Sequence, residues 1–299
     1  MPAAPSTSVI VPIGAVDDLV EMQLRAIAAQ DITEPFDVLL SLNSPSPAQR
    51  DALDAAVARL GDDRFIVVDS SDRRGASHAR NVGVAKASAD RLAFCDADDI
   101  VERDWLRRLL IGLETFDAVG GHLDERELVP ARQRSWRPPA TPGELPRFQG
   151  VPYIVSANMA VRRAAFDAVG GFDEELSRCE DIAISFSLLH HGFTIGYVAD
   201  AVVKYRHRGG LKALIRQHYL YGKGMTEVLT RLGVPSTSTS SSAGQPALAQ
   251  PTGLGLLKAN RSRGQQWSMF MVIRRASTLS GRLVGLRAER RRRVTGTST

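Results

Sequence analysis

Apolar and polar positions alternate with two different periods through the first 115 residues, and these periods predict alternating strands and helices. Runs of β-branched or apolar residues typical of buried strands occur at 8–12, 36–42, 64–68 and 92–95. Between these runs apolar residues recur every three or four positions, as they do on one face of a helix; in the first such segment they are Leu19, Met22, Ala26 and Ile27. Strand and helix alternating in this way predict a parallel sheet with right-handed crossovers and helices on both faces.

The regular alternation stops after residue 113. The stretch 129–152 is rich in Pro and Arg and has no clear period. A loop of this length inside a compact domain is usually functional, so we interpret it as a flap on the substrate side. The other elements that we expect are strands at 116–122, 194–198 and 201–205 and helices at 161–169, from 180 onward, and from 211 to about 232.

The C-terminal part differs from the rest in composition. Residues 235–253 are almost entirely Ser, Thr, Pro, Gly, Ala and Gln, which predicts a flexible linker. Beyond it, apolar residues spaced three, four or seven apart with arginines between them predict an amphipathic helix. We divide the chain into an α/β domain at 1–232, a flexible linker at 233–257 and a basic amphipathic helical tail at 258–299. The tail helix either packs on the body or lies on an anionic membrane surface, and we favour the membrane.

Charge is distributed unevenly along the chain. The net charge is +5, but eleven Lys or Arg face the single Glu289 between Lys258 and Arg293. The first 257 residues are therefore acidic, with 27 basic against 32 acidic side chains. Nucleic-acid-binding domains usually carry their positive charge along one folded face, so we expect no nucleic-acid partner.

Length and composition set the compartment and the size of the core. With 299 residues and 43% hydrophobic content, the chain can bury one large core with an appendage. It has no apolar run of 18 residues, and its first residues lack the features of a signal peptide. Cys95 and Cys179 have no metal-binding spacing and are interpreted as reduced packing residues. We expect a cytoplasmic protein, peripheral at the inner face of the cell membrane if the tail binds lipid.

Three carboxylates follow the fourth predicted strand, in the sequence FCDADD at 94–99. Open α/β sheets bind ligands at the carboxyl ends of their strands. Side chains two apart on an extended segment point the same way, so Asp96 and Asp98 can converge on one divalent cation. Alternatively, Asp98 or Asp99 caps the helix that contains Trp105, but capping accounts for only one acid. We favour a cation site.

Several blocks occur in a fixed order: SVIVP at 8–12, GASHARNVG at 75–83, FCDADD at 94–99, SANMAVRR at 156–163, GGFDEEL at 170–176, ED at 180–181 and RHR at 206–208. Together they resemble the inverting family 2 glycosyltransferases over residues 8–232. The resemblance implies the GT-A type of α/β fold, a mostly parallel nucleotide-binding sheet flanked by helices with a short mixed acceptor-side region, here followed by the helical tail. It also implies transfer of a sugar from a UDP, GDP or dTDP sugar to a hydroxyl acceptor (glycan, lipid or small molecule) with Mn²⁺ or Mg²⁺, in cell envelope or polysaccharide biosynthesis.

The resemblance assigns roles to individual residues. Asp96 and Asp98 would bind the metal and the donor, with His207 as a third metal ligand. Arg206 and Arg208 would hold phosphate oxygens. The remaining donor-binding candidates that lie in matching blocks or turns are Pro12, Asn43, Asp72, Arg80 and Asn158. Arg80 would lie near the nucleotide base; the alternative is that it is a solvated residue on a packed helix.

The acidic pair that follows GGFDEEL matches the position of the catalytic base in the family. We expect Asp181 to be the base, with Glu180 second and Asp173 third. A helix N-terminus stabilises an ionised carboxylate, which would keep such a base ready near neutral pH. Alternatively, these acids only favour the first turn of a helix.

Two segments depart from the family pattern. Ile13-Gly14 replaces the usual polar pair after the first strand, and Asn43-Ser44-Pro45 replaces an acid-containing turn, for which Asp69 or Asp72 could substitute. The nucleotide base is therefore left open. One rival function is a nucleotidyltransferase, which would need a Gly-rich basic loop after the first strand that 13–17 does not supply. The other is a non-catalytic module that binds a sugar nucleotide or a membrane surface, in which the acids would be degraded.

Overall fold

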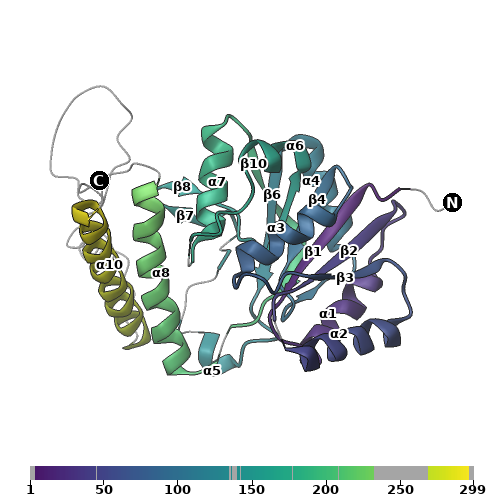
Figure 1. Cartoon of the computed structure of the whole chain (residues 1–299), viewed down its shortest axis with the longest axis horizontal. Coiled ribbons are helices and arrows are strands. Elements are labelled where there is room, and N and C mark those ends of the chain that lie inside the picture. The colour runs from purple at the N-terminus through teal and green to yellow at the C-terminus, as the bar shows by residue number, and fades with distance from the viewer. Residues whose placement is uncertain are drawn as a thin grey trace.

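Figure 1 shows the computed structural model of the chain. It describes residues 4–44, 46–134, 136, 140–141, 143–176, 178–207, 209–231 and 269–295. Within the last helix, side chains are described for residue 273 and residues 276–288. The predicted linker at 233–257, the start of the predicted tail at 258–268 and Arg208 lie outside the described residues.

A mixed sheet of eight strands forms the centre of the fold, in the order β3-β2-β1-β4-β9-β6-β10-β5. Neighbours β3, β2, β1 and β4 are all parallel, as are β6 and β10. β9 runs antiparallel between β4 and β6, and β5 runs antiparallel to β10. The strands are β1 Thr7–Ile13, β2 Phe36–Leu42, β3 Phe65–Asp69, β4 Arg91–Cys95, β5 Ile100–Val101, β6 Ala118–Asp124, β9 Asn158–Arg162 and β10 Ile195–Lys204.

Helices cover both faces of this sheet because strand side chains alternate between two apolar clusters. On β1, Val9 and Val11 pack into one cluster and Ile10 into the other. The first cluster is covered by α1 Asp18–Ala28, α2 Pro47–Leu60 and α4 Trp105–Thr115, and the second by α3 Ala76–Lys86, α6 Arg163–Ala168 and α7 Glu180–His190. The predicted helices on both faces of a mostly parallel sheet are thereby confirmed.

Two local predictions were wrong, and a third segment contains elements that were not predicted. The segment 161–169 is not one helix: β9 continues to Arg162, and α6 begins only at Arg163. The two strands expected between 194 and 205 are one strand, β10, with a register irregularity between Val198 and Val202. The described part of the 129–152 stretch contains a short helix, α5 Ala131–Arg134, and a two-stranded hairpin, β7 Arg147–Phe148 with β8 Val151–Pro152.

The apolar face of α1 also differs from the prediction. Met22 is 48% exposed, whereas Gln23 is fully buried. The Gln23 amide donates to the Asp96 carbonyl at 3.1 Å and accepts from the Val101 N–H at 3.0 Å. Gln30, two residues beyond the end of α1, donates to the Glu102 carbonyl at 2.8 Å. Burial of these amides is offset because each is hydrogen-bonded, and together they fix the loop that follows β4.

Two long helices stand outside the sheet layers. α8 Leu211–Arg231, which confirms the predicted helix at 211–232, lies beside the body, and α10 Met269–Thr295 packs along its outer side (Figure 1). Of the two readings of the tail, packing on the body is therefore observed for α10. Within the described ranges every helix is too short or too polar to cross a lipid bilayer.

Gly121 in β6 tests how tightly the sheet centre is packed. A methyl group at this position would overlap the Ala201 carbonyl oxygen and the Asn158 amide. We expect Gly121→Ala to lower the free energy of unfolding by about 3 kcal/mol. The Ala201 carbonyl is backbone of β10 and the Asn158 amide is held by its own hydrogen bonds, so neither can easily move aside. Urea unfolding measures this, with Gly14→Ala as control, since a Cβ at Gly14 meets nothing within 4 Å. Equal stability of the two variants would contradict the packing described.

Candidate active site

A buried arginine joins the strand-end acids to the start of α7. Leu92 and Phe94 point to the cluster beneath α3 and α7, and Asp96 follows at the next position of the alternation. Arg80 of α3 donates through Nη2 to Asp96 Oδ1 at 2.8 Å and through Nη1 to Glu180 Oε1 at 3.1 Å. The alternative in which Arg80 is solvated is wrong, since its side chain is 3% exposed.

The environment of Arg80 explains how a charge is kept in this interior. Two carboxylates bind the guanidinium, and the Phe172 ring lies with its centroid 5.4 Å from the guanidinium carbon. Burial raises the pKa of Asp96, while the Arg80 charge opposes that rise. Contact between Arg80 and a nucleotide base stays a prediction.

Asp98 and Asp99 engage a second arginine. Arg206, which follows β10, donates through Nη2 to Asp98 Oδ2 at 2.9 Å. Its backbone N–H donates to Asp99 Oδ1 at 2.8 Å. Asp99 is 1% exposed, and burial together with the Asp96 charge raises its pKa well above the usual range. Asp99 thus anchors the 206 segment and caps no helix: the N-cap position of α4 is Asp104.

The convergence of Asp96 and Asp98 on one cation stays a prediction, although the two-residue alternation on which it was based ends with the strand. The strand ends at Cys95 and the chain turns through residues 97–98, so the alternation no longer applies. Each of the two carboxylates binds its own arginine. Among the residues with described side chains, no three His, Cys, Asp or Glu form a group that could hold a metal ion.

His207 is held by an acid that the sequence analysis missed. Its Nε2 lies 2.8 Å from Glu125 Oε1, and the two side chains are only 8% and 12% exposed. Tyr205 packs against the His207 ring with its centroid at 5.1 Å. His207 Nδ1 has no hydrogen-bond partner within the described part of the chain. Glu125 follows β6 as Asp96 follows β4, so the rule that located Asp96 also points to Glu125.

Asp181 lies in the first turn of α7. Its Oδ1 accepts from the Ile182 N–H at 2.9 Å. Burial, and next the charge of Glu180, raise the pKa of Asp181 to about 7. The helix N-terminus was expected to keep this carboxylate ionised; burial outweighs that effect. The Asp181 charge and burial also raise the pKa of Tyr221 on α8, to about 12, so the Tyr221 hydroxyl stays protonated near neutral pH.

Two of the other candidates are bound by protein groups. Asn158 is 1% exposed; its amide donates to the His122 and Ala201 carbonyls and accepts from Trp105 Nε1. Asn43 donates to the Arg73 carbonyl at 2.7 Å and accepts from the Gly75 N–H at 2.9 Å. These bonds give both asparagines a structural role, and their contact with a donor stays a prediction.

Asp72 and Pro12 lie on the margin of the acid cluster. Asp72 Oδ1 lies 2.9 Å from His78 Nε2, whose Nδ1 lies 2.9 Å from Glu174 Oε2. Burial lowers the pKa of His78, but the two carboxylates outweigh it and raise the pKa. This network ties the turn before α3 to the GGFDEEL block. Pro12 lies within β1, in register with Ser41 of β2.

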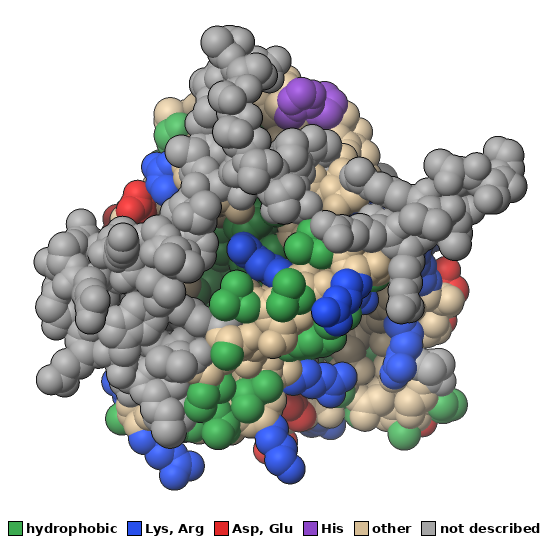
Figure 2. All heavy atoms as spheres, turned by 90° about the vertical axis from the view of Figure 1, so that its left-hand side faces the viewer, with side chains coloured by type: hydrophobic (Ala, Val, Ile, Leu, Met, Phe, Trp, Pro, Cys, Tyr) green, Lys and Arg blue, Asp and Glu red, His purple; other side chains and the backbone are tan. Residues whose placement is uncertain are grey.

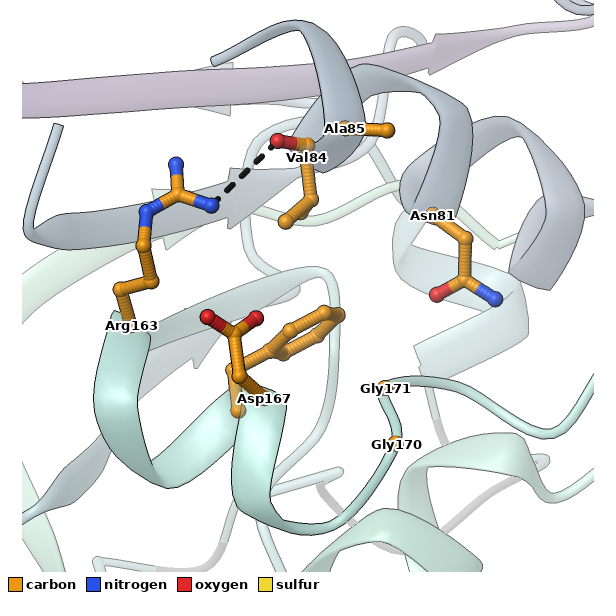
Figure 3. Close-up of a pocket in the computed structure, with 8 residues that line it drawn as sticks. Asn81, Val84, Ala85, Arg163, Asp167, Gly170 and Gly171 are labelled. Atoms are coloured by element: carbon orange, nitrogen blue, oxygen red, sulfur yellow. Dashed lines mark hydrogen bonds between the residues drawn. The ribbon is translucent and has the colours of Figure 1, made fainter. Parts of the chain in front are cut away.

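A surface cavity of about 360 Å³ lies between α3 and α6 (Figure 3). Arg163 points across it toward the Val84 carbonyl and also donates to the Ala87 carbonyl at 3.0 Å. Asn81 is bound to Phe172 and Glu174. None of the strand-end acids lines this cavity, so it is separate from the predicted chemistry.

Comparison with known proteins places most of the chain in one group. The family model described as glycosyl transferase family 2 matches residues 8–170, and the model of glycosyl transferase family group 2 matches residues 146–271. The pre-mycofactocin glycosyltransferase of Mycobacterium tuberculosis is 31% identical over 170 residues, covering 53% of this chain and 36% of the relative. The succinoglycan biosynthesis protein ExoO of Rhizobium meliloti is 29% identical over 160 residues, covering 52% and 43%. The matched stretch thus spans about two fifths of these relatives.

Solved structures agree with the GT-A type of fold. The mannosyltransferase PcManGT from Pyrobaculum calidifontis, in complex with GDP-Man and Mn²⁺, superimposes with a TM-score of 0.67 at 17% identity, covering 95% of this chain and 88% of that protein. Staphylococcus aureus TarS in complex with UDP-GlcNAc gives a TM-score of 0.54 at 19% identity, covering 75% and 66%. The expected fold class is confirmed.

The Arg80 junction makes a quantitative stability prediction. Arg80→Ala removes an enclosed guanidinium and leaves Asp96 and Glu180, which are 32% and 16% exposed, without their cation. We expect this change to cost about 3 kcal/mol of unfolding free energy in urea titrations. Arg73→Ala is the matched control, because Arg73 also binds two carboxylates, Glu174 and Glu175, but is 43% exposed. The control should change stability little. Similar losses in both variants would show that burial of Arg80 is not what makes its ion pairs important.

Proposed function

Because the chain belongs to glycosyl transferase family 2 and is a glycosyltransferase, we propose that it moves a sugar from a nucleotide-diphosphate sugar to a hydroxyl acceptor with inversion at the anomeric carbon. The observation that carries this proposal is the Arg80 junction, in which one guanidinium binds Asp96 at the end of β4 and Glu180 at the start of α7. The proposed donor-side acid, Asp96, therefore lies close to the pair Glu180-Asp181, which contains the proposed base.

The donor side is proposed at the carboxyl ends of β1 and β4. Ligands of open α/β sheets bind at this edge, where the strand order changes direction. The named complexes of PcManGT with GDP-Man and of TarS with UDP-GlcNAc support a sugar nucleotide as donor. Arg206 would bind phosphate oxygens once the donor enters, because its guanidinium already lies at the Asp98 carboxylate.

The residues at this edge fit a divalent cation. Asp98 is 39% exposed and offers the oxygen ligands that Mg²⁺ and Mn²⁺ prefer. His207 is oriented by Glu125 at Nε2, which leaves Nδ1 as a buried, unpartnered lone pair. A carboxylate on the far ring nitrogen is the usual support of a metal-binding histidine. We propose Asp96, Asp98 and His207 as ligands; a cation held there neutralises charge on the leaving diphosphate. Arg206 would have to release Asp98 to admit it.

Asp181 is proposed as the base. The acceptor oxygen attacks the anomeric carbon, the bond from that carbon to the diphosphate oxygen breaks, and the hydroxyl proton passes to an Asp181 carboxylate oxygen. Glu180 is the weaker candidate because Arg80 already binds its carboxylate. A base with a pKa of about 7 is matched to proton transfer near neutral pH.

Metal binding through Asp98 and His207 is tested both by turnover and by direct titration. Asp98→Asn should lower Mn²⁺-dependent release of nucleotide from the donor by orders of magnitude. Glu125→Ala should weaken Mn²⁺ affinity about 10- to 100-fold in titrations with bound nucleoside diphosphate, because His207 loses its support. Asp200→Asn, at an exposed carboxylate, is the control. Full activity in excess chelator would exclude the cation.

The pH profile tests Asp181. Since its carboxyl must be ionised to accept a proton and its pKa is about 7, kcat/KM should rise about tenfold per pH unit below 7 and level off above it. Asp181→Asn should lower transfer about 10²- to 10⁴-fold while donor affinity persists.

Glu180→Gln separates the two acids. Removing the Glu180 charge, which raises the Asp181 pKa, should move the rise in kcat/KM to lower pH and leave transfer in place. Near-normal transfer by Asp181→Asn, or loss of transfer in Glu180→Gln alone, would assign the base elsewhere.

A further inference from the structure

α10 is held against α8 by a seam of small residues. A Cβ at Gly222 of α8 would overlap the Thr278 carbonyl, and one at Gly281 of α10 would overlap the Tyr219 carbonyl. A Cβ at Gly285 would lie 3.0 Å from Thr226 Cβ. The two backbones therefore approach as closely as glycine permits, as in small-xxx-small helix pairs. This contact fixes which face of α10 is turned toward α8.

The opposite face of α10 exposes large apolar side chains. Ser277 and Gly281 are buried at the seam, whereas Leu279 and Leu283, two positions further along, are 55% and 57% exposed. Residues two apart on a helix lie on roughly opposite sides. Burial of Ser277 and Gly281 at the seam therefore explains why these leucines are exposed. Figure 2, which views this side of the molecule, shows hydrophobic side chains with Lys and Arg between and around them.

The segment that contains this face is strongly basic. Between Met269 and Thr295 the sequence has eight arginines and one acid, Glu289. Arg287 is exposed, and the partly buried Arg282 donates to Met225 Sδ of α8 at 3.6 Å. At 1.5 Å per residue, the 27 residues of α10 form a rod of about 40 Å.

We propose that the outward face of α10 docks on an anionic lipid bilayer surface, with Leu279 and Leu283 entering the headgroup boundary and the arginines binding lipid phosphates. An interfacial helix combines apolar side chains on one face with basic residues beside them, and α10 has both. The helix packs on α8 through its glycine face, so packing on the body and docking on a membrane use different sides.

Charge and exposed apolar side chains disfavour two other occupants of this face. A second copy docked symmetrically would bring two segments of eight arginines and one acid together. A nucleic acid would satisfy the arginines but leave the exposed leucines without apolar contact. A bilayer containing acidic lipid satisfies both.

The experiment is flotation of the full-length protein with vesicles of phosphatidylcholine alone or mixed with 30% phosphatidylglycerol, at low and high salt. We expect binding only to the anionic vesicles, weakened by salt. Leu279→Ser with Leu283→Ser should reduce binding at least tenfold. Ile111→Ser, a similar change at a side chain that is 49% exposed on α4, should bind like the wild type. Thermal unfolding should show that both variants remain folded.

Three results would overturn the proposal: no binding to anionic vesicles, equal binding to neutral vesicles, or wild-type binding by the double leucine variant. Concentration-dependent dimerisation that the leucine substitutions abolish would assign the face to a second copy instead. Release of nucleotide from the donor is measured on the same samples. The leucine variant should retain it, so that a failure of the donor chemistry is distinguishable from a failure of docking.

Discussion

The site depends on one buried cation. Arg80 lies on α3, and its two terminal nitrogens bind Asp96, which follows β4, and Glu180, which begins α7. Without a positive charge here, Asp96 and Glu180 would repel each other in a partly buried site, where water screens charges less than in bulk solvent. The packing of α3 and α7 on the same face of the sheet therefore requires these ion pairs as well as apolar contacts. The apolar contacts include those among the rings of Phe94, Phe166 and Phe172, which pack against one another beneath the junction.

Most acids around this junction bind a basic side chain. Asp98 binds Arg206, Asp96 and Glu180 share Arg80, and Glu125 binds His207. Concentrating carboxylates at the end of a sheet is costly, and each partner offsets part of that cost. The ion pairs also differ in how easily their side chains can exchange partners. Arg206 and Asp98 are about one third exposed and can exchange partners, whereas Arg80 is enclosed and remains a fixed part of the frame. Asp181 has no arginine bound to it within the described contacts, and burial together with the Glu180 charge raises its pKa.

Periodicity in the sequence was sufficient for the strands and helices that alternate from Thr7 to Thr115, because each is decided by local apolar spacing. It failed at β9, where a strand passes directly into α6 and no turn residue separates the two periods. Gln23 could not be identified as a core residue, since its burial depends on a backbone loop far along the chain. The rule that functional residues follow the carboxyl ends of strands located Asp96. It could not identify Arg80 as its partner, because the sequence does not show which helix packs over which strand. The raised pKa of Asp181 depends likewise on burial in the assembled fold, which no local pattern reveals.

The orientation of α10 is set by close contact between its backbone and that of α8 along the glycine seam. Substitutions on its outward face leave Gly222, Gly281 and Gly285 untouched, so they change what that face adheres to without turning the helix. A lineage could therefore exchange one target surface for another through a few outward positions while the catalytic body stays the same. The reverse does not hold: a single methyl group added at the seam displaces the whole rod and every contact that it makes. Across relatives that share α10, we would look for small residues fixed along the inner edge and rapid divergence on the outer one.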